Sequence, residues 1–151
     1  MSHTETLPSS VTHTAAARET VNRRPRRVLR RIGAVAAGLV AIFAVTTAVD
    51  VVLHAAGVFP PVGVPMSSAL LLLALAYRFV FDVGGCWLTA RLAPDRPMGH
   101  ALALGAIGLV LSIAGAVAMW DAGSNWYPIA LAVSSLPSAW LGGKLRVRYA
   151  R

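Results

Sequence analysis

The sequence predicts an all-α membrane protein with four transmembrane helices in an antiparallel up-down-up-down bundle and both termini in the cytoplasm. Three observations predict this fold class. The chain of 151 residues is 56% hydrophobic and only 13% charged, against about 25% charged residues in an average soluble domain. Its apolar residues form four runs with short connections. Its basic residues flank those runs instead of spreading over a surface.

The four apolar runs predict transmembrane spans at about residues 32–53, 68–90, 99–119 and 127–143. At 1.5 Å per residue, segments of this length match a hydrocarbon core of about 30 Å. The connections are short, and short connections place consecutive helices antiparallel to one another. Residues 1–31 are rich in Ser, Thr, Ala and Arg, with Pro8 and Pro25, so we expect a disordered basic tail there. A second, short basic tail follows at residues 144–151.

The distribution of Lys and Arg predicts the orientation of the spans. Thirteen of the fourteen basic residues lie in the N-terminal tail, the 91–97 loop and the C-terminal tail. The 54–67 and 120–126 loops contain none. Because basic loops stay on the cytoplasmic side, both termini and the middle loop are expected there.

Composition argues against several classes of function. The net charge of +8 would suggest nucleic-acid binding in a soluble protein. Here the charges sit beside apolar runs, so we interpret them as topology signals and expect no nucleic-acid partner. The chain has one cysteine, Cys86, and its four histidines show no ligand spacing. No glycine-rich loop follows a strand pattern. We therefore expect no metal, no cofactor and no enzymatic activity.

Three charged residues inside the predicted spans are the most unusual feature of the sequence. Arg78 and Asp82 lie one turn apart in the second span, and Asp50 lies near the outer end of the first span. A charge at the centre of a membrane helix costs about 2.5–3.5 kcal/mol or more. Asp50 is about 9 Å from Arg78 in depth, within reach of a guanidinium side chain. These residues form a candidate cluster for helix register, a proton or ion pathway, or simple snorkelling.

The third span contains a regular series of small residues. They follow one another at steps of four, three, four and three positions: Ala101, Gly105, Gly108, Ser112 and Gly115. Small residues at this spacing let two helix backbones approach closely. We call this series the small-residue seam and predict a helix-packing face. The seam fits either a contact inside the bundle or a homo-oligomer interface.

The part of the chain from residue 78 to 143 resembles a family of small four-span bacterial inner-membrane proteins. The resemblance rests on LAPDRP at 92–97, WYP at 126–128 and LPSAWLGG at 136–143. It implies a bacterial inner membrane and brings no catalytic residues. The expected role is structural or accessory, with the arginine-rich tail on anionic lipid head groups. The alternative is a small proton- or ion-coupled transporter that uses Asp50, Arg78 and Asp82.

Overall fold

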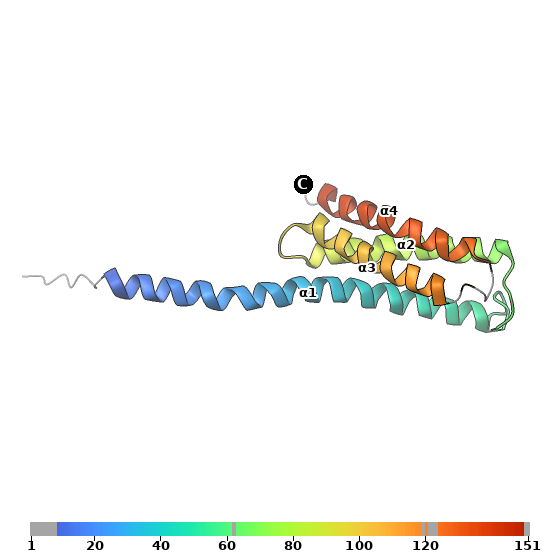
Figure 1. The fold of residues 1–151 in the computed structure, drawn as a ribbon, viewed down its shortest axis with the longest axis horizontal. Helices are drawn as coiled ribbons and strands as arrows, with labels where there is room; N and C mark the ends of the chain where they lie inside the picture. The colour runs from blue at the N-terminus through green and yellow to red at the C-terminus, as the bar shows by residue number, and fades with distance from the viewer. Residues whose placement is uncertain (1–8, 62, 119, 121–123, 150–151) are drawn as a thin grey trace, which may run out of the picture.

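The computed structural model shows an all-helical chain with four long helices (Figure 1). It describes the backbone of residues 9–61, 63–118, 120 and 124–149, and within these ranges the side chains from residue 27 onward. The helices are α1 (Ser9–Ala55), α2 (Ser68–Leu92), α3 (Pro97–Ala118) and α4 (Trp126–Tyr149). In Figure 1 the colour gradient runs in alternating directions along successive helices.

Helix α1 begins much earlier than the sequence predicts. The backbone is helical from Ser9, so helix covers most of the segment that we expected to be a disordered tail up to residue 31. This part of α1 projects beyond the other three helices (Figure 1). Its alanines and arginines have high helix propensity, which a reading based on apolar periodicity does not count. Residues 1–8 lie outside the described part of the chain.

Three of the helices are long and apolar enough to cross a membrane. These segments are Arg27–Ala55, Ser68–Leu92 and Pro97–Ala118. Helix α4 forms where the sequence predicts the fourth span, but it does not reach the same apolar length. It contains Pro137 and three serines, and basic residues occupy its last turn. Its apolar part, at residues 127–143, is therefore the shortest of the four predicted spans.

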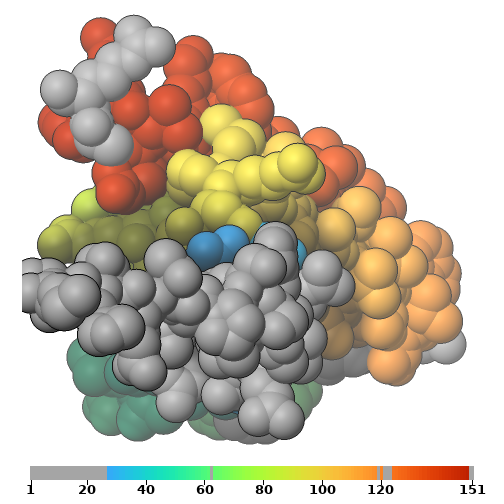
Figure 2. Space-filling model, turned by 90° about the vertical axis from the view of Figure 1, so that its left-hand side faces the viewer, coloured from blue at the N-terminus to red at the C-terminus, as the bar shows by residue number. Residues whose placement is uncertain are grey.

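The helices pack with α2 and α3 between α1 and α4. Helix α4 contacts both α2 and α3 extensively, and α1 contacts α2 and, over a smaller area, α3. Among the described residues, the backbones of α1 and α4 do not approach each other closely. Figure 2 looks along the helices onto the end where the α2–α3 connection lies, next to the last turns of α4. Met98 and Gly143 pack against each other there.

Small residues make the closest contacts between these helices. A Cβ atom at Gly142 of α4 would lie only 2.8 Å from the Cβ of Cys86 on α2. At Gly38 of α1, it would lie 2.8 Å from the carbonyl oxygen of Gly85 on α2. Many large apolar side chains lie on the outside of the bundle instead, with Val117 73% exposed. Close backbone contact inside and apolar side chains outside are what a bilayer favours.

Candidate functional site: intramembrane charges and a central cavity

A charged contact within the apolar part of the bundle joins α1 to α2. Arg78 Nη2 on α2 donates to Asp50 Oδ2 on α1 at 2.5 Å. The Tyr77 hydroxyl donates to the other carboxylate oxygen of Asp50. The Arg78 and Asp50 side chains are 32% and 26% exposed. The carboxylate of α1 is thus held by two consecutive residues of α2.

This geometry gives the members of the predicted cluster different surroundings. Arg78 extends across to Asp50, so it does not pair with Asp82 along its own helix. Among the described residues, Asp82 has no hydrogen-bond or ion-pair partner. Tyr77 was not predicted, since its position next to Arg78 in sequence gives no signal that both side chains reach the same carboxylate. This contact depends on how α1 lies against α2, which is a property of the tertiary structure.

Asp82 instead faces a cavity at the centre of the bundle. The cavity has a volume of about 190 Å³ and receives side chains from all four helices. The polar residues in its wall are Asp82, Cys86, Ser112, Ser135 and Ser138. The apolar residues are Leu39, Ile42, Phe43, Leu104 and Leu111. A carboxylate in such a place can take up a proton or a cation.

The small-residue seam forms part of this same cavity. Gly105, Gly108 and Ser112 line it together with Asp82. Because two of these residues have no side chain, α4 can approach α3 closely on this face. The structure therefore joins two features that the sequence analysis treated as separate, the small-residue seam and one residue of the charge cluster.

The seam packs against α4 over part of its length. Ala101 is fully buried, and a Cβ at Gly105 would lie 3.1 Å from the carbonyl oxygen of Ser135. Gly108 is in ordinary contact distance of the same serine, at 3.9 Å. At Gly115, by contrast, a Cβ would have no described atom within 4 Å. A seven-residue repeat drifts by about 20° per heptad around a straight helix, so the last seam position leaves the contact.

A second, more open cavity of about 720 Å³ lies at the end of the bundle near Asp50. Its wall includes Thr47, Asp50 and His54 of α1 and the chain at 57–61. His54 Nδ1 lies 2.8 Å from the backbone carbonyl oxygen of Asp50. The His54 ring packs edge-on against Phe59, with the two centroids 5.4 Å apart. This cavity therefore lies between the last turns of α1 and the start of the α1–α2 connection.

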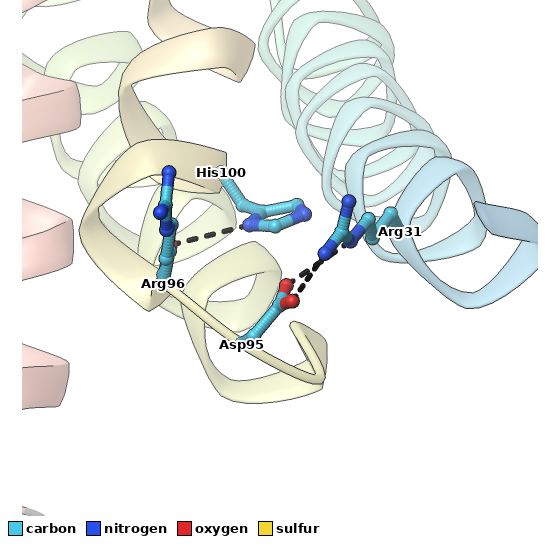
Figure 3. A network of polar contacts seen from close by, with 4 residues as sticks. All are labelled: Arg31, Asp95, Arg96 and His100. Atoms are coloured by element: carbon cyan, nitrogen blue, oxygen red, sulfur yellow. Dashed lines mark hydrogen bonds and ion pairs between the residues drawn. The ribbon is translucent and has the colours of Figure 1, made fainter. Parts of the chain in front are cut away.

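At the opposite end, an ion pair ties α1 to the α2–α3 connection (Figure 3). Arg31 Nε donates to Asp95 Oδ1 at 3.1 Å, and Arg31 Nη2 donates to Oδ2. The hydrogen bonds from Arg31 lower the pKa of the Asp95 carboxyl below its ordinary value. Arg96 follows with a φ of +42°, and its carbonyl oxygen accepts the backbone N–H groups of Gly99 and His100. The connection therefore caps α3 while Asp95 holds α1.

Comparison with protein-family models, with curated proteins and with solved structures gives no match for this chain. Its resemblance to four-span bacterial membrane proteins therefore stays a prediction.

Proposed function

We propose that this chain is a four-span protein of a bacterial inner membrane, with both termini in the cytoplasm. Three helices are long and apolar enough to span. Helix α4 packs along α2 and α3, so it shares their environment. With an even number of spans, both termini lie on the same side. The basic tails and the basic 91–97 loop then all face the cytoplasm.

Aromatic contacts at one end of the bundle support a membrane interface there. The Arg91 guanidinium lies 5.3 Å from the centre of the Trp87 ring, and Lys144 Nζ lies 4.3 Å from the centre of the Trp140 ring. Tryptophans with cations stacked on them are typical of a membrane interface. The first pair lies at the end of α2, next to the basic 91–97 loop, and the second lies on α4, next to the basic C-terminal tail.

Cysteine labelling tests the orientation. In a Cys86→Ala background, single cysteines at Ser124, Ser10 and Arg148 are treated in intact cells with a membrane-impermeant thiol reagent. We expect labelling at Ser124 only, and labelling at all three positions after the cells are opened. Labelling at both Ser124 and position 148 in intact cells would leave α4 without a membrane crossing, and labelling at Ser10 and position 148 but not at Ser124 would reverse the orientation.

The role we propose for this protein is structural or accessory and not enzymatic. The observation that carries it is the contact of Asp50 with Tyr77 and Arg78, which uses charge to fix α1 against α2. A charge paired in this way sets helix register, because any sliding of α1 would strand it in an apolar environment. Proteoliposomes of the native protein should then show no more solute-dependent proton flux than empty liposomes.

Proton- or ion-coupled transport is the second candidate, and one observation favours it. Asp82 has no bonded partner among the described residues and faces the central cavity. Within a membrane, such a carboxylate is suited to carry a proton or bind a cation. Flux through the native protein that disappears in Asp82→Asn would establish this function in place of the structural one.

The arginine-rich tail is proposed to bind anionic lipid head groups. Seven arginines precede residue 32. Each basic residue close to an anionic surface contributes about 1 kcal/mol before screening. Replacement of Arg23, Arg24, Arg26 and Arg27 by Gln should weaken binding of a peptide of residues 1–31 to vesicles that contain phosphatidylglycerol. Unchanged binding would leave the arginines as a topology signal alone.

A further inference from the structure

We propose that the central cavity is a binding site for a small organic cation, with an ammonium group on Asp82 and an apolar body against α1 and α3. Binding at this site does not require transport and does not depend on the structural role of the Asp50–Arg78 pair. Three properties of the cavity support such a ligand: its charge balance, its hydrogen-bond chemistry and its shape.

The charge balance calls for one positive charge. With both carboxylates ionised, Asp50, Arg78 and Asp82 together carry a net charge of −1. Arg78 lies one turn from Asp82, but its Nη2 is bonded to Asp50 on the other helix. No basic residue lines the cavity among the described residues. A ligand with a single positive charge would balance Asp82, whereas an anion would add to the unpaired charge.

The serines of α4 fit an ammonium donor. The hydroxyl of Ser135 donates to the carbonyl oxygen of Leu131, and the hydroxyl of Ser138 donates to that of Ser135, both at 2.9 Å. Their hydrogens are thus committed, and their oxygens remain as acceptors. With the Asp82 carboxylate they offer the acceptors that the three N–H groups of a primary ammonium need.

The size and walls of the cavity favour an organic cation over a metal ion. A cavity of about 150 Å³ lined by apolar side chains admits benzene, and this one has a volume of about 190 Å³. It therefore has room for one ring and a short ammonium arm. Five apolar side chains from α1 and α3 face the serines and Asp82 across it. A hydrated metal ion would leave these side chains without an apolar partner.

The cavity can be reached from the apolar side of the bundle. Phe43 and Leu111 line it, and they are 73% and 56% exposed. They belong to α1 and α3, which contact each other over a smaller area than the other packed pairs. An amphipathic amine dissolved in the bilayer would therefore reach Asp82 without crossing the packed α2–α4 contact.

A titration with two isosteric probes tests the proposal. The full chain in lipid nanodiscs is titrated with 4-fluorobenzylammonium or with neutral 4-fluorobenzyl alcohol, and bound probe is followed by fluorine NMR against protein-free nanodiscs. We expect saturable binding of the cation, at least tenfold tighter than that of the alcohol. Asp82→Asn should weaken binding of the cation at least tenfold, whereas Asp95→Asn, a matched change outside the cavity, should alter it less than twofold.

A second variant keeps the test decisive if Asp82→Asn disturbs folding. Ser112→Leu retains the carboxylate and fills the cavity, so it should abolish binding while circular dichroism stays native. Equal affinity for both probes would mean that Asp82 is protonated and the cavity merely apolar, which overturns the proposal. Absence of saturable binding, or an unchanged affinity in Asp82→Asn, overturns it as well. None of these results bears on the Asp50–Arg78 pair, whose role is measured by unfolding.

Discussion

Replacement of Arg78 by Met should show with which carboxylate the Arg78 guanidinium forms its ion pair. In Arg78→Met, Asp50 keeps the Tyr77 hydroxyl but loses its cation. Removing one partner of a fully buried ion pair costs about 3–5 kcal/mol. Because the two side chains are 32% and 26% exposed and Tyr77 still donates, we expect the free energy of unfolding to fall by about 2 kcal/mol.

A double-mutant cycle assigns this loss to a particular partner. The Arg78→Met, Asp50→Leu variant removes both charges, so its free energy of unfolding should lie within about 1 kcal/mol of the native value. Asp50→Leu alone should also cost about 2 kcal/mol, because it leaves the Arg78 guanidinium without its carboxylate, so the coupling energy between these two positions is about 3–4 kcal/mol. In the matched cycle with Asp82→Leu, the coupling should be only about 0.5 kcal/mol, as for two residues one turn apart on a helix.

Reversible unfolding in mixed micelles, followed by far-UV circular dichroism, measures all of these variants. If the coupling energy of Arg78 with Asp82 equals or exceeds that with Asp50, Asp50 is not the main partner of Arg78. The prediction is also refuted if Arg78→Met is as stable as the native protein, because the contact between α1 and α2 would then contribute nothing to the fold.

Two further predictions concern helix contacts. Gly142→Ala places a Cβ 2.8 Å from Cys86 Cβ and from the Trp87 backbone nitrogen, so it should lower the free energy of unfolding by about 1–3 kcal/mol. Gly115→Ala has open space and should leave that free energy unchanged or raise it by up to about 1 kcal/mol; similar losses at both positions would contradict the packing. At the other end of the bundle, the Asp95 pKa lies below 3.8, so the contribution of Asp95 to stability is complete above that pH and is lost as the pH falls through the lowered pKa. Carboxyl NMR should show this pKa rise toward 3.8 in Arg31→Gln, and an unchanged titration would mean that Arg31 does not hold the carboxyl.

The helices themselves could be read from the sequence with little help. Four apolar runs predict α2 and α3 nearly to their ends and locate α1 and α4. Ala74, Gly85, Cys86 and Thr89, which are small or polar residues at helical spacing, are buried along one face of α2. These features depend on composition and helical periodicity, which are local properties of the chain. The early start of α1 at Ser9 was missed because a charged, apolar-poor segment gives no periodic signal.

The sequence alone predicted that Asp50, Arg78 and Asp82 lie inside the spans and that α3 carries a face of small residues, and it left open whether Arg78 pairs with a carboxylate or snorkels. The packing of the helices makes Asp50 the partner of Arg78, adds the Tyr77 hydroxyl to that contact, and leaves Asp82 facing the cavity beside Gly105 and Gly108. Helical spacing places Asp50 and Asp82 within similar reach of the guanidinium. The choice between them depends on how α1 lies against α2, and the close approach at Gly38 and Gly85 fixes that contact between residues far apart in the chain.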